Sequence, residues 1–132
     1  MKEEMANNEY YEFHVDVEKN RIYLTIKGYW PSAEAVGNYV NDLKMCLDRI
    51  SSGYTSLVDM TRGKVPHKDA FEVLIQGREL TLQAGLGRQA QVVTEPLEKL
   101  ASNRIDKETG LEKEKVRKFN SVQEAEAWLD AR

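Results

Sequence analysis

Hydrophobic and polar residues alternate strictly in two short segments near the start of the chain. The alternate positions are apolar in both segments: Phe13, Val15 and Val17, then Ile22, Leu24 and Ile26. A repeat of two residues is that of a β-strand with one buried face. Because the polar tripeptide Glu18-Lys19-Asn20 separates the segments, we predict an antiparallel hairpin. Residues 1–9 are polar and acidic, and we expect them to be a disordered lead-in to a domain that spans residues 10–132.

The chain then changes to a helical repeat, with apolar residues three and four positions apart. Ser32 is a candidate N-cap for a first helix of about five turns, and Gly53 follows it as a candidate left-handed cap. A second helix is predicted over residues 67–84. Arg78 falls on the apolar stripe of this second helix and narrows it, and Gly77 weakens the prediction slightly.

Two more helices are predicted in the second half of the chain. Pro96 suits the first turn of a third helix, and we assign its inward face to Leu97, Leu100, Ala101 and Ile105. The last helix begins with the capping box Ser121-Val122-Gln123-Glu124, in which a hydroxyl and a carboxylate satisfy free backbone amides.

Short apolar runs between these helices predict further strands, at residues 57–60, 89–94 and 117–119. A hairpin followed by alternating strands and helices implies parallel crossovers and helices packed on the sheet. The sequence therefore predicts a single α/β domain, with a mixed β-sheet of about four to five strands and about four helices.

The composition is that of an ordinary globular domain. The 132 residues include 19 Lys+Arg and 22 Asp+Glu, for a net charge of −3, which argues against nucleic acid as a partner. We see no signal peptide and no apolar run long enough to span a membrane, so we expect a cytoplasmic protein. A homodimer is compatible with the sequence, which does not fix the oligomeric state.

Candidate catalytic and metal-binding groups are few. His14 and His67 are the only histidines and lie far apart, and the single cysteine, Cys46, falls inside the first predicted helix. The run Gly85-Leu86-Gly87 resembles part of a dinucleotide fingerprint, but a helix precedes it and a strand follows, which reverses the required context. We interpret it as a helix stop, and we expect no catalytic residues, metal or cofactor.

A basic stretch follows the third predicted strand. It contains Thr61, Arg62, Lys64, His67 and Lys68, which we call the basic corner. The stretch stands before a helix amino terminus, whose free amides favour anions, so phosphate or an acidic partner surface could bind there. A solvated loop is the alternative. Asp59 lies at the carboxyl end of the strand, where open sheets border a functional crevice, or it accepts hydrogen bonds from the following loop.

Large aromatic residues offer a second candidate contact. Tyr29 and Trp30 follow the second predicted strand, and Trp128 lies in the last helix. Core packing is the usual fate of such side chains. If Trp30 is exposed beside the first helix, it becomes a contact for a partner or an apolar ligand.

Several of these segments resemble the STAS domain of anti-sigma-factor antagonists, and more closely its SpoIIAA-like branch, which is also similar to small CRAL-TRIO-type lipid-binding domains. The resemblance spans roughly residues 10–131 and rests on four segments: Ile26-Lys27-Gly28, Pro31-Ser32, Leu57-Val58-Asp59-Met60 and Glu124-Ala125-Glu126-Ala127-Trp128-Leu129. Antagonists of the family carry a phosphorylatable serine after the third strand. This chain has no serine between Ser56 and Ser102, and Thr61 lies before the loop, so the resemblance implies a member without the phosphorylation switch.

Two functions follow as expectations. The first is a non-enzymatic regulatory module that binds a protein partner at the basic corner. The second is a domain that holds a small apolar or anionic ligand between helices and sheet, near Tyr29 or Trp30. A sizeable apolar pocket would favour the ligand, whereas a filled core would favour the protein partner.

Overall fold

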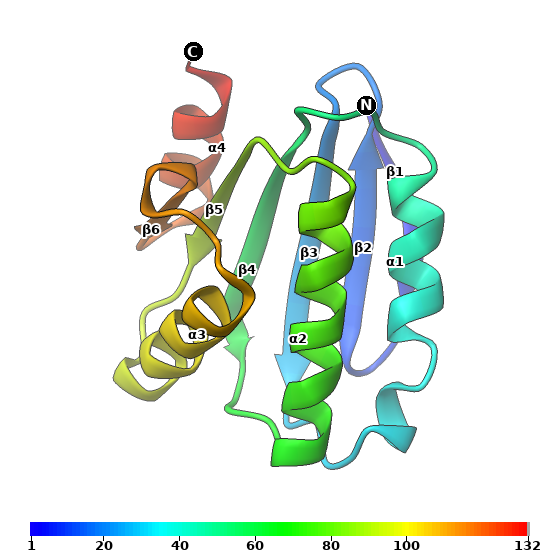
Figure 1. Cartoon of the computed structure of the whole chain (residues 1–132), viewed down its shortest axis with the longest axis vertical. Coiled ribbons are helices and arrows are strands. Elements are labelled where there is room, and N and C mark those ends of the chain that lie inside the picture. The colour runs from blue at the N-terminus through cyan, green and yellow to red at the C-terminus, as the bar shows by residue number, and fades with distance from the viewer. Residues whose placement is uncertain (132) are drawn as a thin grey trace.

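The computed structural model describes residues 1–131 and contains one six-stranded sheet in the order β1-β2-β3-β4-β5-β6 (Figure 1). The strands are β1 (Lys2–Asn7), β2 (Tyr11–Asp16), β3 (Arg21–Gly28), β4 (Thr55–Gly63), β5 (Arg88–Val92) and β6 (Val116–Phe119). The pairs β1–β2 and β2–β3 are antiparallel, and the three remaining pairs are parallel. The predicted α/β fold with a mixed sheet that a hairpin opens is confirmed.

Helices cover both faces of the sheet. They are η1 (Glu34–Val36), α1 (Tyr39–Leu47), α2 (Lys68–Gln83), α3 (Pro96–Thr109), η2 (Lys113–Lys115) and α4 (Val122–Asp130). In Figure 1, α1, α2 and α3 lie in front of the sheet and α4 lies behind β5 and β6. The core accordingly forms two clusters, a large one under α1 and α2 and a small one under α4. No helix of residues 1–131 is long and apolar enough to cross a membrane.

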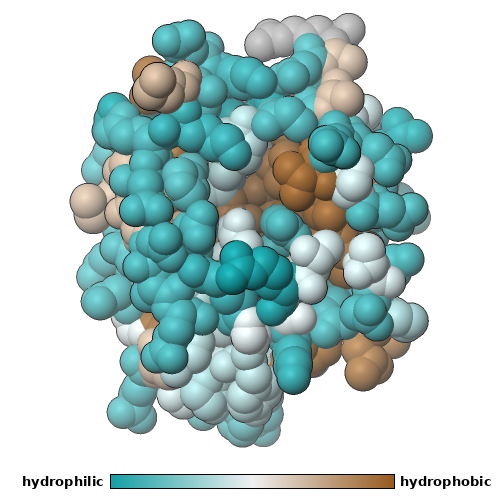
Figure 2. Space-filling view, turned by 180° about the vertical axis from the view of Figure 1, so that it is seen from behind, coloured by the Kyte–Doolittle hydropathy of each residue, from teal (hydrophilic) through white to brown (hydrophobic). Residues whose placement is uncertain are grey.

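The face behind the sheet is mainly hydrophilic. Figure 2 shows polar side chains over most of it, with one hollowed hydrophobic area on the side that carries α4. Strands β2 and β3 present polar residues such as Glu12 and Thr25 to that face, because the alternation turns their apolar partners toward α1 and α2. The large core, and any cavity within it, therefore lies on the front of the sheet.

The amino terminus corrects one prediction. Residues 1–9 were expected to be disordered, yet Lys2–Asn7 form β1, which adds a strand at the edge of the sheet. Most side chains of β1 are exposed, so its sequence lacks the alternation of apolar and polar residues that predicts a strand. Backbone pairing with β2 and a bidentate ion pair between Glu3 and Arg49 hold it in place.

The first predicted helix is shorter and is broken. Instead of five continuous turns, the structure has the 3₁₀ turn η1 and then α1. The hydroxyl of Ser32 accepts a hydrogen bond from the amide of Ala35 at 3.1 Å, but the N-cap of the 3₁₀ turn is Ala33 and not Ser32. Gly53 has a φ of +87°, as expected of a left-handed residue, but it lies in the turn beyond the helix end.

The inward face of α3 was predicted only in part. Ile105 is buried as expected, but Leu97 and Leu100 are 68% and 65% exposed, and Ser102 is buried instead. The physical reason lies in β5, which presents Gln91 to this helix: its side chain accepts a hydrogen bond from Ser102 and donates one to Asp106, so this face of α3 is polar. At the last helix, Ser121 accepts a hydrogen bond from the amide of Glu124 at 3.2 Å, which is half of the predicted capping box.

Candidate functional site

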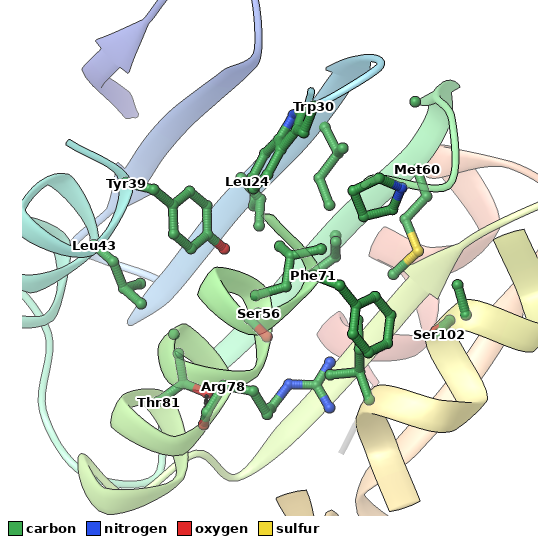
Figure 3. A pocket seen from close by; sticks show the side chains of 18 of the residues that line it. Leu24, Trp30, Tyr39, Leu43, Ser56, Met60, Phe71, Arg78, Thr81 and Ser102 are labelled. Atoms are coloured by element: carbon green, nitrogen blue, oxygen red, sulfur yellow. Dashed lines mark hydrogen bonds between the residues drawn. The ribbon is translucent and has the colours of Figure 1, made fainter. Parts of the chain in front are cut away.

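A cavity of about 90 Å³ lies between the front of the sheet and helices α1, α2 and α3 (Figure 3). Most of its lining is apolar, and its aliphatic and aromatic residues include Leu24, Val58, Met60, Phe71, Leu74 and Ile105. This volume is several times the ~15 Å³ that one water requires and is well below the ~300 Å³ of a drug-sized site. The cavity therefore suits a small ligand, or a longer one that extends out of its mouth.

One wall of the cavity is aromatic. Trp30 and Tyr39 contact each other with ring centroids 5.2 Å apart, and Phe13 lies 5.4 Å from Tyr39. Trp30 is only 1% exposed, and its indole Nε1 donates a hydrogen bond to the carbonyl of Tyr10 at 2.9 Å. We call Phe13, Trp30 and Tyr39 the aromatic wall; Tyr11 packs behind these rings and does not line the cavity.

Trp30 and Tyr29, the two aromatic residues predicted as contacts, lie in different environments. Trp30 is buried, so the condition under which it would contact a protein partner is not met, but it does line the cavity. Tyr29 is 48% exposed and does not line it. Trp128 packs against Phe119 on α4 and β6, with Arg88 stacked over its ring, on the other side of the sheet.

The hydroxyl of Tyr39 is the most unusual polar group of the cavity. The side chain is 4% exposed, and its oxygen points into the cavity in Figure 3. No hydrogen bond joins it to a partner among residues 1–131, whereas the neighbouring Tyr11 hydroxyl donates to Asp42 Oδ2 at 2.6 Å. Burial raises the pKa of Tyr39, and the positive charge of Arg78 opposes this rise. The hydroxyl is therefore a protonated donor that faces the cavity.

The opposite wall is a buried polar network, which we call the polar wall. At its centre, Arg78 of α2 donates to Asp106 Oδ1 at 2.6 Å and to Gln89 Oε1 at 2.7 Å. Further hydrogen bonds join side chains of β4, β5, β6 and α3, namely Ser56, Gln91, Ser102 and Lys118. Arg78, Ser56, Gln89 and Ser102 also line the cavity. On this side, the apolar lining of the cavity therefore gives way to hydrogen-bond donors and acceptors that hold one another in place.

Positive charge exceeds negative charge within this network. Asp106 is the one carboxylate that pairs with both Arg78, at 2.6 Å, and Lys118, at 3.4 Å. Burial lowers the pKa of Lys118, although Asp106 opposes this shift. No acceptor among residues 1–131 bonds to Nε of Arg78. The inner end of the cavity therefore offers an unused donor on a cation that is only partly compensated.

The exposed and half-buried lining residues mark the mouth of the cavity. Lys64 and Val65, from the connection between β4 and α2, form one side, and Glu98 and Ala101 of α3 form the other. Lys64 and Glu98 carry opposite charges, so the mouth has little net charge. The mouth also joins the cavity to the basic corner, because Lys64 belongs to both.

The structure keeps the basic corner at the surface. Arg62, Lys64 and Lys68 are exposed, and none of them forms an ion pair within the described part of the chain. His67 is the N-cap of α2: its Nδ1 accepts a hydrogen bond from the amide of Asp69 at 3.2 Å. One of the helix amides expected to attract an anion is therefore already satisfied.

Asp59 and Thr61 belong to β4 and not to a loop. Oδ1 of Asp59 accepts hydrogen bonds from the backbone amide of Thr61 at 3.0 Å and from its hydroxyl at 2.7 Å. This is the structural role given above as the alternative for Asp59. Neither residue lines the cavity.

The remaining chemical candidates lie elsewhere. Cys46 is fully buried in α1, and burial raises the pKa of its thiol to about 12, so it is neutral near pH 7. Gly85 has a φ of +93° and ends α2, as the reversed glycine motif predicts. Glu4, Glu12 and His14 place potential ligand atoms within 4.8 Å of one another on the back of the sheet, and they are the described residues that could hold a metal ion.

The topology defines the class of the protein: it has the SpoIIAA-like fold that the sequence resemblance predicts. The same fold occurs in an uncharacterized protein of the DUF3478 family from Shewanella loihica PV-4, which has a SpoIIAA-like fold and is 18% identical to this chain. The match covers 94% of this chain and 97% of that one, with a TM-score of 0.68. At this identity the likeness establishes the fold alone.

A weaker likeness, to the solved structure of Mglu, covers 61% of this chain and 19% of that one, at 20% identity and a TM-score of 0.45. A TM-score of this size carries no argument about the fold. No protein-family model and no curated protein matches the chain.

Tyr39 and Arg78, which supply the unusual polar groups of the cavity, were not among the predicted site residues. Tyr39 read as one more apolar position of a helix, and the sequence does not show that its hydroxyl lacks a partner. Two signals were present for the polar wall: Arg78 interrupts the apolar stripe of α2, and Gln89 and Gln91 alternate within an apolar strand. Polar side chains at core positions require partners, and here the partners lie together at one end of a cavity.

Proposed function

We propose that the protein is a non-enzymatic binding domain that holds a small, mainly apolar ligand between its sheet and helices α1, α2 and α3. The single observation that supports this proposal most strongly is the apolar cavity, which lies where a well-packed domain would have a filled core. A filled core would instead have favoured a module that acts only through its surface.

The composition of the cavity also suits binding. Apolar side chains from β3, β4, α2 and α3 provide desolvated contact area, while Arg78, Ser56 and Tyr39 provide a few polar groups that can orient a ligand. We place no nucleophile or general base there: among the described residues that line the cavity there is no histidine or cysteine.

Regulation through a protein partner is the second candidate. It rests on the basic corner, where Arg62, Lys64 and Lys68 are exposed cations without acidic partners in the described chain. Because Lys64 also borders the mouth of the cavity, ligand occupancy and partner binding could influence each other at this residue. Such a module would act without the phosphorylation switch of the anti-sigma-factor antagonists.

Blocking the cavity tests the ligand proposal. Ala101 lines the mouth, so Ala101→Phe should fill it, whereas Asn103→Phe places the same ring on an exposed position of the same helix. Using octanoate and octanol as probes in isothermal titration calorimetry, we expect the unmodified protein and Asn103→Phe to bind at least one probe. Ala101→Phe should bind neither. Equal binding by both variants, or no binding by the unmodified protein, would refute the proposal.

The basic corner has its own test. Arg62→Ala combined with Lys64→Ala should weaken binding of inorganic phosphate or of an acidic peptide if the corner recognises anions, because two exposed charges are lost. Unchanged binding by this variant would remove the second candidate.

A further inference from the structure

Three donors at the inner end of the cavity have unused hydrogen-bonding capacity. The Tyr39 hydroxyl has no partner within residues 1–131, and Nε of Arg78 has no acceptor there. The hydroxyl of Ser56 accepts a hydrogen bond from Gln89 Nε2 at 2.9 Å, but donates none to the described residues. Each of these side chains is more than nine-tenths buried. No fully buried side-chain nitrogen or oxygen atom of residues 1–131 lacks a hydrogen-bond partner, so these donors keep accessible surface toward the cavity and are open to a ligand atom that accepts hydrogen bonds.

These groups come from three different elements that border the cavity. Tyr39 lies on α1, Ser56 on β4 and Arg78 on α2, and in Figure 3 the Tyr39 oxygen points into the cavity while the Arg78 guanidinium reaches toward α3. Gly77 allows Tyr39 to approach α2: a Cβ at this position would lie 2.8 Å from Cε2 of Tyr39, so only glycine lets the tyrosine ring pack this close to the helix. The position of the Tyr39 hydroxyl at the cavity is therefore set by helix packing and does not depend on a loop.

The charge distribution favours an anion at the inner end over the mouth. At the mouth, the lining residues Lys64 and Glu98 carry opposite charges, so there is little net charge there. At the inner end, Arg78 and Lys118 share the single carboxylate of Asp106. Within the low-dielectric interior, an additional negative charge beside Arg78 would be stabilised more than the same charge at the exposed mouth.

We propose that the ligand is a small amphipathic carboxylate that binds head first, with its carboxylate against Arg78, Tyr39 and Ser56 and its apolar part directed toward the mouth between Val65 and Ala101. This inference rests on the proposed function and specifies its ligand class. A carboxylate matches the three donors, because its two oxygens provide about four acceptor positions. The apolar lining between the donors and the mouth matches a short hydrocarbon chain.

The test compares three probes that share one chain: octanoate, octanol and methyl octanoate. Calorimetric titration of the whole chain should show octanoate binding about tenfold more tightly than octanol or the ester, since only octanoate places a charge against the guanidinium. Arg78→Gln should abolish this preference.

Tyr39→Phe provides the sharper variant, because Arg78→Gln also removes the partner of Asp106 and could unfold the domain. Tyr39 has no protein hydrogen bond to lose, so Tyr39→Phe should fold as the unmodified protein does, yet bind octanoate about tenfold more weakly. Tyr11→Phe is the matched control, because Tyr11 does not line the cavity and should leave the affinity unchanged.

The outcomes separate the two proposals. Tighter binding of octanoate, lost in Tyr39→Phe but kept in Tyr11→Phe, supports head-first carboxylate binding. Equal affinity for all three probes, or unchanged octanoate affinity in Tyr39→Phe, overturns the head-first arrangement but leaves an apolar binding domain. If no probe binds the unmodified protein, the proposed function fails together with this inference.

Discussion

The aromatic wall and the polar wall face each other across one cavity, and they are built in opposite ways. The aromatic wall is held by ring contacts at 5.2–6.0 Å, and its one hydroxyl that faces the cavity is unpaired. The polar wall is held by short hydrogen bonds around Arg78, and its charges are shared among several elements. One wall thus contributes contact area and a free donor, and the other contributes charge.

This difference between the two walls indicates that some groups of one core stabilise the fold while another is available to bind a ligand. Removing a ring from the aromatic wall leaves a larger void, whereas removing a charge from the polar wall leaves other charges without compensation. The Tyr39 hydroxyl belongs to neither kind of stabilising interaction. We therefore expect it to matter for a ligand and not for folding, which the variants below examine in order of decreasing effect.

Trp30→Ala should have the largest effect. The indole is 1% exposed and contacts both Tyr11 and Tyr39, so its loss should lower the free energy of unfolding by about 4 kcal/mol. Urea denaturation followed by far-ultraviolet circular dichroism measures it. Tyr29→Ala is the control, since this exposed neighbour should change stability by about 0.5 kcal/mol or less. Equal effects at the two positions would contradict the assignment of Trp30 to the core.

Asp106→Asn should come next. The substitution keeps the shape of the side chain but leaves Arg78 and Lys118 without a carboxylate, and we expect a loss of about 2 kcal/mol. Adding Lys118→Met to Asp106→Asn removes one of the uncompensated cations, so the double variant should recover part of this loss. Strict additivity of the two single changes in urea denaturation would show that the polar wall is not one coupled network.

Two tyrosine variants should sharpen the comparison further. Tyr11→Phe removes the 2.6 Å hydrogen bond to Asp42 and should lower the free energy of unfolding by about 1 kcal/mol. Tyr39→Phe removes a hydroxyl without a protein partner and should leave stability unchanged or slightly higher. Thermal denaturation of both variants in parallel checks this, and a larger loss in Tyr39→Phe would mean that its hydroxyl has a structural partner.

The smallest expected effect is a pH dependence at Lys118. Burial lowers the pKa of its ammonium in the folded state, so over the range between the lowered pKa and about 10.5 the unfolded chain binds more protons than the folded one. Stability of the unmodified protein relative to Lys118→Met should therefore rise as the pH increases through that range. Denaturation of both proteins at several alkaline pH values measures the difference, and a constant difference would indicate a solvated lysine.

Much of the fold could be predicted from local patterns. The alternation around Glu18-Lys19-Asn20 identified the hairpin, and Ser121 identified the start of α4, because both signals act over a few neighbouring residues. Strand β1 could not be recognised, since its pairing lies at a sheet edge and its side chains are mostly solvated. Leu97 and Leu100 were misplaced because the inward face of α3 depends on what β5 offers it.

The cavity was harder to predict than the fold, because it depends on how residues far apart in the sequence pack together. Arg78 and the alternating glutamines of β5 were visible as exceptions to an apolar pattern, but the pattern did not show that they meet. Gly77 suggested only a weaker helix, whereas in the structure it permits the approach of Tyr39 to α2. Spacing along the chain predicts which face a residue occupies, and contacts between faces decide whether a donor such as the Tyr39 hydroxyl is left free.

The orientation of a bound carboxylate tests the central claim most directly. Nuclear Overhauser effects between octanoate and the isotope-labelled protein report which end of the probe lies at which end of the cavity. Head-first binding predicts contacts from the methylene beside the carboxylate to the ring of Tyr39, and from the terminal methyl to Val65 and Ala101. The reverse pattern, or contacts confined to the basic corner, would contradict it.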